Sequence, residues 1–342
     1  MSFSVAHRAQ KIYSTVLEIF DYKKSSDVVT PYDAVKQQVE GVSSNAIVCI
    51  PGAGIGTYVV ALIEQGIKPE NIYTVELDES YYKLGSAMLE RLGVNYVHTD
   101  FLDWNPSMQF DVIVGNPPYQ NPNKGKKTAN GRSSNGSPLW VKFIRKSTEL
   151  LKEGGTLSLL IPSAVTTPNS RGMSAAKGMT LVDVKFNMNS YFGVGTDISR
   201  VTWVKSKVDA PLTVNGVDYP RHLPIANVAD ESEFNRLVNI WSGSSKWEYM
   251  DNRGHDKRQH KDDILVIRRM YSGSTFKYNE GLDMSKFDKE SLVGLRCSSP
   301  EEMSLWVNFL NSDASKFIRR VTNYAGNISA AFLQPIDPTV LN

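Results

Sequence analysis

An apolar, β-branched run that ends in Asn116-Pro117-Pro118-Tyr119 has the clearest chemical meaning in this sequence. The run at 111–115 is typical of a buried strand. Proline has a fixed φ and no N–H, and the residue before a proline is pushed out of the helical region. We therefore expect a stiff, extended shelf at the carboxyl end of a strand, which is where open α/β sheets bind their ligands.

Such a shelf suits the methylation of a planar amino group, which is a poor nucleophile because its lone pair is delocalised into the ring. The side-chain oxygen of Asn116 and the carbonyl of Pro117 would each accept one N–H of that amine and align its nitrogen with an incoming methyl group. Pro118 stiffens the backbone, and the ring of Tyr119 would stack on the flat substrate. No base is needed before attack, because the proton can leave once nitrogen is alkylated. On these four residues alone, an ordinary turn after a strand stays open as the alternative.

This motif after an apolar strand resembles the signature of amino-group methyltransferases that use S-adenosylmethionine. These are mainly N6-adenine DNA methyltransferases, and they include RNA adenine methyltransferases and the glutamine methyltransferases of release factors. The resemblance implies S-adenosylmethionine as the cofactor. It also implies a Rossmann-like α/β fold, with a mostly parallel seven-stranded sheet, helices on both faces and a C-terminal α+β target-recognition region.

A glycine-rich turn separates a predicted buried strand at 46–50 from a predicted helix that ends near Gln65. Its candidate cofactor-binding residues are Pro51, Gly52, Gly54 and Gly56. Glycines at this place let the backbone approach a ligand closely at the positive end of a helix. The spacing differs from the dinucleotide fingerprint, so the turn alone is a weak signal. The family usually has an acid before the proline, whereas this chain has Ile50, so either the amino group of the cofactor is held in another way or the cofactor is bound more weakly.

Carboxylates end the next two predicted strands, at 72–77 and 95–98. Glu76 suits the two ribose hydroxyls of an adenosine, although a surface acid that starts a helix is the alternative. In the resembling family, an acid at the position of Asp100 accepts the adenine amino group, and an apolar neighbour, here Phe101, packs on the ring. These motifs and the Asn-Pro-Pro-Tyr motif follow four successive strands, a register far more specific than any one of them.

Two further contacts follow from the resemblance. In the family, a Thr-Pro near the N-terminus packs against the methionine end of the cofactor, and Thr30-Pro31 matches it. The same pair is also a good helix start, with Thr30 as the cap and Pro31 as the first residue. An aromatic residue forms the second wall of the target-base pocket. Phe192 is the candidate and Tyr191 the reserve, and either is equally compatible with a place in the core.

The polar segment 120–137 directly follows the shelf, and Ala129 is its only apolar residue apart from proline. It carries four basic residues and no acid: Lys124, Lys126, Lys127 and Arg132. This composition predicts a flexible basic loop that closes on the phosphate backbone of a nucleic acid. A solvated linker that acts as a lid over any substrate is the alternative. The net charge of the chain is only +2, so nucleic-acid contacts must come from such local patches.

The sequence pattern changes after Lys207, which predicts a catalytic domain at 1–208 and a target-recognition, DNA-binding region at 209–342. The glycine turn comes first, the Asn-Pro-Pro-Tyr motif second and the recognition region last, which is the γ order of the family. Gly154-Gly155 is expected to end a helix. Other expected elements are helices at 6–20, 31–39, 139–152, 231–241, 300–310 and 312–321, strands at 156–161, 181–187 and 201–205, and a hairpin at 212–219.

The composition is that of an ordinary globular protein, with 41% hydrophobic and 22% charged residues. The two cysteines, Cys49 and Cys297, lie far apart and show no metal-ligand spacing, so we expect no metal and a reducing cytoplasm. The first twenty residues indicate neither a signal peptide nor a membrane span. The resemblance places such a cytoplasm in a bacterial or phage-infected cell.

The resemblance implies a site-specific DNA adenine-N6 methyltransferase of restriction–modification type. It would bind duplex DNA, flip an adenine out of the stack and transfer a methyl group to N6. A methyltransferase of RNA adenine or of a release-factor glutamine is the alternative, as is a binding module that has lost catalysis. The glutamine enzymes usually carry a helical domain before the core and little after it, the reverse of this chain. The recognition sequence, a cognate endonuclease and the oligomeric state stay open.

Overall fold

The computed structural model describes most of the chain: Lys11, Ser14, 29–119, 138–193, 195–206, 209–249, 264–268, Phe276, Tyr278, 292–325 and 328–341. The predicted helix at 6–20 falls almost wholly outside these residues. The basic segment 120–137 also falls outside them. Contacts divide the chain into two compact units, the first formed by 1–165 with 171–212 and the second by 166–170 with 213–342.

The first unit is built on a mostly parallel sheet whose described strands run in the order β3-β2-β1-β4-β5-β7-β6. Only β7 runs antiparallel to its neighbours β5 and β6 among the described pairings of this unit. The strands are β1 (Val48–Pro51), β2 (Ile72–Glu76), β3 (Asn95–His98), β4 (Phe110–Gly115), β5 (Leu151–Pro162), β6 (Thr180–Lys185) and β7 (Ile198–Val204). This order confirms the predicted Rossmann-like methyltransferase architecture.

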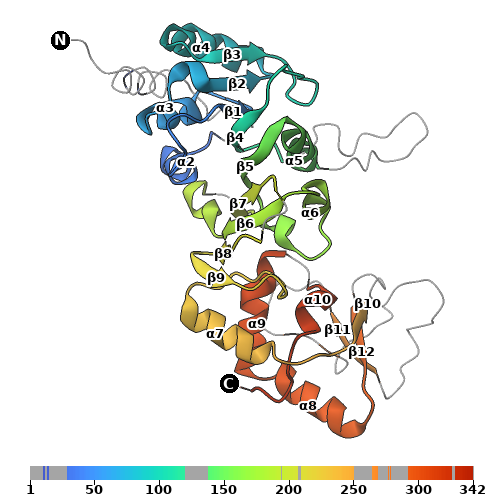
Figure 1. Ribbon diagram of the computed structural model, residues 1–342. Coiled ribbons are helices and arrows are strands. Elements are labelled where there is room, and N and C mark those ends of the chain that lie inside the picture. The colour runs from blue at the N-terminus through green and yellow to red at the C-terminus, as the bar shows by residue number, and fades with distance from the viewer. Residues whose placement is uncertain are drawn as a thin grey trace, which may run out of the picture. The chain divides into compact units, whose positions relative to one another are not determined.

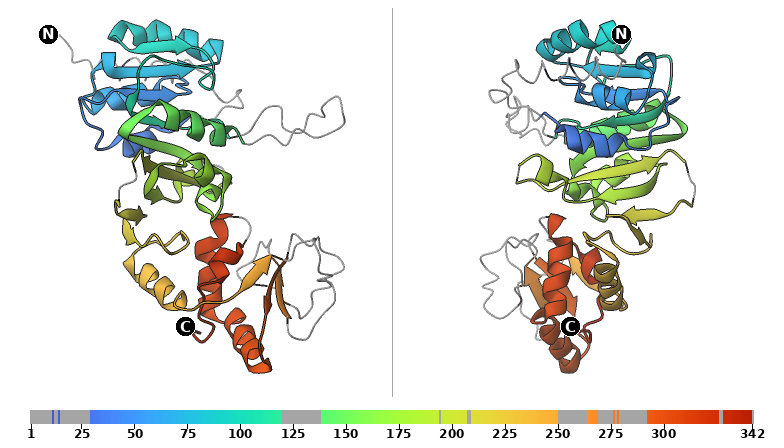
Figure 2. Two further views of the ribbon diagram at one scale, coloured as in Figure 1. Left: turned by 45° about the vertical axis from the view of Figure 1, so that its right-hand side comes forward. Right: turned by 90° about the vertical axis from the view of Figure 1, so that its left-hand side faces the viewer.

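Helices cover both faces of this sheet. Figure 1 shows α2 and α3 on one side and α5 and α6 on the other, and two further views of the same unit are given in Figure 2. The helices are α2 (Tyr32–Val39), α3 (Thr57–Glu64), α4 (Glu79–Leu89), α5 (Leu139–Leu150) and α6 (Arg171–Ala175). Short 3-10 turns lie at Pro69–Asn71, Glu90–Leu92, Ser163–Thr166 and Met188–Tyr191. Among the described helices of the chain, none is long and apolar enough to cross a membrane.

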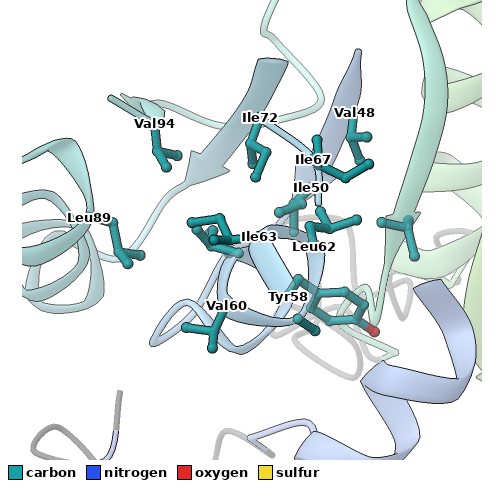
Figure 3. Packing of buried hydrophobic residues seen from close by; sticks show 14 of the residues in the cluster. Val48, Ile50, Tyr58, Val60, Leu62, Ile63, Ile67, Ile72, Leu89 and Val94 are labelled. Carbon is teal, nitrogen blue, oxygen red and sulfur yellow. The ribbon is translucent and has the colours of Figure 1, made fainter. Parts of the chain in front are cut away.

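The core of this unit lies where α3 packs on the parallel strands. Strands that are covered on both faces read as continuous apolar runs, and Val48, Cys49 and Ile50 of β1 are all fully buried. Figure 3 shows Ile50, Leu62 and Ile72 gathered between the strands and α3. This packing holds the carboxyl end of β1 against the first turn of α3.

Two predicted boundaries were wrong. Helix α2 begins at Tyr32 with Pro31 as its N-cap residue, so Thr30 is not the cap. The hydroxyl oxygen of Thr30 instead accepts a hydrogen bond from the side-chain amide of Asn116. Helix α5 ends at Leu150, and Gly154-Gly155 lies inside β5 instead of ending the helix. The two glycines exchange hydrogen bonds of 2.8 Å with Lys205 while the pairing of β5 with β4 shifts register, so they form a bulge.

The second unit is α+β, as predicted for the C-terminal region. Its described elements are the hairpin β8 (Leu212–Val214) and β9 (Val217–Tyr219), the antiparallel sheet of β10 (Trp247–Tyr249), β12 (Leu292–Arg296) and β11 (Ile264–Arg268), the helices α7 (Glu231–Ile240), α8 (Pro300–Leu310), α9 (Asp313–Thr322) and α10 (Ala330–Leu333), and a 3-10 turn at Asn323–Ala325. Asn215 and Gly216 turn the hairpin with positive φ angles of 52° and 86°. Ser299 caps α8, as its sequence indicates.

Candidate active site

The predicted site residues converge on the carboxyl edge of the parallel sheet. The chain leaves β1 toward β2 and β3 on one side and returns to β4 on the other, so the strand order reverses between β1 and β4. Ligands of open α/β sheets bind at such a switch point. The two strands approach closely here, because a Cβ on Gly115 would lie 3.3 Å from the carbonyl oxygen of Pro51. Gly115 was not among the predicted site residues, and its role is to allow this approach.

The glycine-rich turn is shaped by three left-handed residues. Gly52, Gly54 and Gly56 have φ angles of 69°, 53° and 88°, a region that favours glycine. Gly56 is also the N-cap of α3, and a Cβ there would lie 2.5 Å from Leu89. A Cβ added at Gly52 or at Gly54, by contrast, would meet nothing within 4 Å. The backbone therefore presents a bare face to a ligand at this turn, beside the first turn of α3.

Glu76 at the end of β2 is held by the turn itself. Its two carboxylate oxygens accept hydrogen bonds of 2.8 Å from the backbone N–H groups of Gly54 and Asp78. The residue is only 8% exposed, and burial raises the pKa of its carboxyl group against the opposing effect of these two hydrogen bonds. Each oxygen keeps a second lone pair. The carboxylate is thus fixed in place and retains capacity to accept hydrogen bonds from hydroxyl groups.

Leu77 is a candidate that the sequence reasoning missed. It directly follows Glu76 and is 63% exposed, the most exposed large apolar side chain among the described residues. The sequence signal was its position between a strand-end carboxylate and a polar run. A single exposed leucine is common on protein surfaces, so its place directly after the fixed carboxylate of Glu76 is what makes Leu77 a candidate.

Asp100 and Phe101 follow β3, as predicted, but they differ in accessibility. The Asp100 side chain is half-buried and accepts a 2.8 Å hydrogen bond from the N–H of Leu102. The ring of Phe101 is 3% exposed and stacks on Phe143 with the ring centroids 5.1 Å apart. Half-buried Leu102 is therefore an apolar neighbour of Asp100 with more free surface than Phe101.

Asn116 carries the most unusual polar atom of the site. Its Nδ2 donates to the hydroxyl oxygen of Thr30 over 3.1 Å, which fixes the plane of the amide. Its Oδ1 is buried and has no hydrogen-bond partner among the described residues. Leaving a buried acceptor unpaired costs about 1–3 kcal/mol. An oxygen that the fold holds in this state is ready to accept an N–H from a ligand.

Thr30 links Asn116 to the first turn of α3. Burial raises the pKa of Tyr58 well above its ordinary range and the nearby Tyr119 adds to the effect, while a hydrogen bond with the Thr30 side chain opposes it. Both Thr30 and Tyr58 are buried. In Figure 3 the Tyr58 hydroxyl points away from the aliphatic side chains of the cluster. Tyr58 was not predicted as a site residue, because its place in the turn after Gly56 favours the core.

The two predicted aromatic walls come together. Tyr119, Tyr191 and Phe192 are partly buried and pack against one cluster of buried side chains, formed by Ala34, Leu160, Met188 and Ile198. The Tyr119 hydroxyl donates to the carbonyl of Leu160 over 3.3 Å, and burial raises its pKa, so it stays a protonated donor. Tyr191 is engaged by a 2.6 Å hydrogen bond from Gln37, which leaves Phe192 the freer of the two rings.

The shelf itself has one buried and one exposed proline, Pro117 and Pro118, and Pro31 is half-buried at the start of α2. The four basic candidates at 124–132 lie outside the described residues. No group of three or more histidine, cysteine, aspartate or glutamate side chains in the described parts of the chain is placed to hold a metal ion.

Comparisons with known proteins point to methylases. Residues 67–193 match the family described as Eco57I restriction-modification methylase. Over 116 residues the chain is 37% identical to the modification methylase CviBIII of Paramecium bursaria Chlorella virus NC1A, a match that covers 34% of this chain and 30% of that protein. It is 30% identical over 149 residues to a tRNA1(Val) (adenine(37)-N6)-methyltransferase of Bacteroides thetaiotaomicron, which covers 39% of this chain and 62% of that protein.

Among solved structures, a putative class I S-adenosylmethionine-dependent methyltransferase of Listeria monocytogenes aligns with a TM-score of 0.49 and 19% identity, over 70% of this chain and 78% of its own. The chain spans under two thirds of the length of both curated relatives. The family match covers Glu76, Asp100 and the Asn-Pro-Pro-Tyr motif and begins after the glycine-rich turn. The sequence matches confirm the predicted resemblance to methylases of restriction–modification systems and, with it, S-adenosylmethionine as the cofactor of this class of enzyme.

Proposed function

We propose that this chain is a site-specific DNA adenine-N6 methyltransferase that acts on an adenine flipped out of duplex DNA. The observation that carries the proposal is the buried, unpaired Oδ1 of Asn116 at the switch point of the sheet. A flipped adenine offers an exocyclic N–H to such an acceptor. A base that is still paired within the duplex has that amino group engaged already.

The residues of the site have distinct roles in this proposal. Asn116 Oδ1 accepts one N–H of the target amine, and the carbonyl of Pro117 accepts the other. The two bonds hold the nitrogen in line and raise its electron density. Tyr119 and Phe192 stack on the two faces of the base. S-adenosylmethionine would supply the methyl group when bound, and the nitrogen that Asn116 and Pro117 hold would lose one proton to water once it is alkylated.

The cofactor-binding residues fit S-adenosylmethionine, which supplies an electrophilic methyl group when bound. The open space over Gly52 and Gly54 admits its methionine part close to the backbone. Glu76 accepts hydrogen bonds from the ribose hydroxyls, Leu77 and Phe101 or Leu102 provide apolar contact for the adenine, and Asp100 accepts from its amino group. Thr30 and Pro31, before α2, and the Asn116 backbone lie at the methionine end, and Pro51 and Gly56 bound the turn.

DNA is the favoured polymer because the matched family and the virus relative are described as modification methylases. RNA is the second candidate, and it is favoured by the tRNA adenine methyltransferase of which the chain matches 62%. A release-factor glutamine lacks the aromatic surface that Tyr119 and Phe192 would cover, so it fits the site less well. A restriction endonuclease that recognises the same DNA sequence is a further candidate partner.

The deciding experiment is methyl transfer from labelled S-adenosylmethionine to unmethylated duplex DNA, with structured RNA and a release-factor peptide as parallel substrates and nucleoside analysis of the product. We expect N6-methyladenine in DNA. Label in RNA or peptide with none in DNA would contradict the DNA assignment. Label in none of the three, despite measured binding of the cofactor, would contradict the catalytic proposal as a whole.

The basic residues Lys124, Lys126, Lys127 and Arg132 give a second test of the partner. We expect their combined replacement by glutamine to weaken DNA binding and to make its salt dependence shallower, by about one unit of slope for each lost phosphate contact. The binding constant is measured across a series of salt concentrations. An unchanged slope would remove the segment 120–137 from the interface.

A further inference from the structure

A buried amide on α2 bridges the neighbouring strands β4 and β5. Gln38 is 6% exposed, and its Nε2 donates to the carbonyl oxygens of Ser158 at 2.8 Å and Gly115 at 3.3 Å. Its Oε1 accepts a 2.7 Å hydrogen bond from the hydroxyl of Tyr58. Both N–H groups and the oxygen are therefore used. A single side chain thus connects α2 with β4, β5 and α3.

These bonds close a circuit around the catalytic shelf. The Thr30 side chain acts on the Tyr58 hydroxyl to lower its pKa, and Thr30 accepts a hydrogen bond from the Nδ2 of Asn116. Starting from the carbonyl of Gly115, the circuit passes through Gln38, Tyr58 and Thr30 and returns to Asn116, the next residue in the chain. Networks of this kind in a low-dielectric interior strengthen and rigidify one another.

The contact with Gly115 has a direct geometric consequence. The carbonyl of Gly115 and the backbone nitrogen of Asn116 belong to one planar peptide group. A donor that holds the carbonyl therefore holds the plane from which the Asn116 side chain starts. Thr30 fixes the other end of that residue at its amide. Asn116 is thereby clamped at its backbone and at its side chain, and both clamps end on the same pair, Gln38 and Tyr58.

We propose that Gln38 is a positioning residue for methyl transfer, which sets the direction of the Asn116 acceptor without touching substrate or cofactor. The inference rests on the proposed role of Asn116. A residue that only filled space at this place would be apolar, because a buried amide is tolerated only when all of its hydrogen bonds are made. The structure instead gives Gln38 three hydrogen bonds, with Gly115, Ser158 and Tyr58, and Gly115 directly precedes the shelf.

The kinetic test compares Gln38→Met with Gln109→Met. Methionine preserves the length of the side chain and removes its donors, and Gln109 is an exposed residue just before β4, at the opposite end of the same strand. We expect Gln38→Met to lower kcat about 10- to 100-fold, the cost of a misplaced reacting group, with an unchanged Kd for S-adenosylmethionine. Gln109→Met is expected to leave kcat unchanged. Rates are measured per cofactor-binding site, so that a smaller folded fraction does not count as a lower kcat.

A second readout does not depend on the substrate. The side-chain amide of Asn116 is followed by NMR in protein with isotope-labelled asparagine, and its signal is identified by its loss in Asn116→Asp. We expect Gln38→Met to shift this signal and Gln109→Met to leave it in place. Tyr58→Phe, which keeps the ring and removes only the hydroxyl, is expected to shift it too and serves where Gln38→Met folds poorly.

The two readouts separate the inference from the function on which it rests. An unmoved Asn116 signal together with an unchanged kcat would overturn the role of Gln38. If the wild-type protein methylated no polymer, the proposed function would fall, and the Asn116 signal would still decide whether Gln38 positions that side chain.

Discussion

The two halves of the carboxyl edge are prepared for their ligands in opposite ways. At β1 and β2 the polar groups are already paired, since Glu76 accepts one backbone N–H from Gly54 in the glycine-rich turn and one from Asp78. At β4 the fold orients Asn116 through Thr30 and leaves its buried oxygen unpaired. A paired carboxylate with spare lone pairs suits tight, unreactive binding. An unpaired acceptor suits a bond that forms only with the reacting group.

The difference is one of energetic cost. The two hydrogen bonds to Glu76 offset part of the cost of burying its charge, whereas the buried Asn116 oxygen has no such bond among the described residues. Functional sites commonly carry such a cost, which the rest of the fold offsets. Removing a paired polar group at β1 or β2, the cofactor half, should therefore lower both cofactor binding and stability. Substitutions at the end of β4, around Asn116, which we call the transfer half, should lower the rate of methyl transfer without a matching loss in the free energy of unfolding.

Asn116→Ala tests this separation and has the largest expected effect. Loss of the oriented acceptor should lower kcat about 10²- to 10³-fold, as loss of a preorganised hydrogen-bonding group does in other active sites. The free energy of unfolding should stay unchanged or rise, because an unpaired buried oxygen is removed. Turnover and denaturant unfolding are measured on the same preparation.

The matched control for that variant is Asn105→Ala. The Oδ1 of Asn105 accepts a 2.8 Å hydrogen bond from Lys146, so here the amide is paired. We expect this change to lower the free energy of unfolding by about 1 kcal/mol and to leave kcat as it is. A loss of stability in Asn116→Ala as large as in Asn105→Ala would contradict the idea that the transfer half is held at a cost.

Glu76→Gln is the corresponding change in the cofactor half. It removes the charged acceptor for the ribose hydroxyls, so Kd for S-adenosylmethionine should rise about 10- to 100-fold while kcat at saturating cofactor changes little. Calorimetric titration measures the affinity. An unchanged Kd would remove Glu76 from the cofactor site.

The raised pKa of Glu76 predicts a pH dependence with a definite sign. Burial favours the neutral carboxyl group in the folded protein, so the stability that this group contributes is present below its ordinary pKa of 4.5 and is lost as pH rises through the raised value. The ionised form is the one that accepts from ribose, so cofactor affinity should rise over the same interval. Glu76→Gln should flatten both dependences. A wild-type affinity that falls with rising pH there would contradict the assignment.

Phe192→Ala tests the aromatic wall of the transfer half and should have a moderate effect. Loss of one stacking face costs about 1–3 kcal/mol per base, so kcat/KM for the nucleic acid should fall roughly tenfold. Cofactor affinity should stay unchanged. Tyr191→Ala, which removes the ring whose hydroxyl Gln37 binds, is the comparison, and a larger loss in that variant would move the wall from Phe192 to Tyr191.

The same contrast explains which features the sequence could predict. The cofactor half consists of strand, turn and helix in one continuous stretch, so Glu76 falls at the end of β2 and β3 has the predicted bounds, Asn95–His98. The hairpin at Asn215-Gly216 and the Ser299 cap are equally local signals. Each of these features is determined by neighbours only a few residues away.

The transfer half depends on partners that are distant in the chain. Thr30 and Asn116 are 86 positions apart, and Gln38 and Ser158 are 120 apart. No periodicity or turn chemistry indicates such pairs, so the sequence favours a helix cap at Thr30 as much as a cofactor contact and gives no reason to select Gln38. The wrong end of α5 has the same origin, because whether Gly154-Gly155 ends a helix or bulges a strand is decided by pairing with β4 and Lys205.

Leu77→Ser tests the apolar surface of the cofactor half and has the smallest expected effect. Because the side chain is 63% exposed, its loss should leave the free energy of unfolding unchanged, unlike that of any buried residue in the same half. Covering a leucine with a ligand ring contributes about 1 kcal/mol, so Kd for S-adenosylmethionine should rise about fivefold. Val238→Ser is the control, since that valine is 40% exposed and lies in the second unit. A Kd that does not move in Leu77→Ser would leave Asp100 and its apolar neighbours as the adenine site. A fivefold rise at constant stability would show that the half with paired polar groups also keeps one surface uncovered for its ligand.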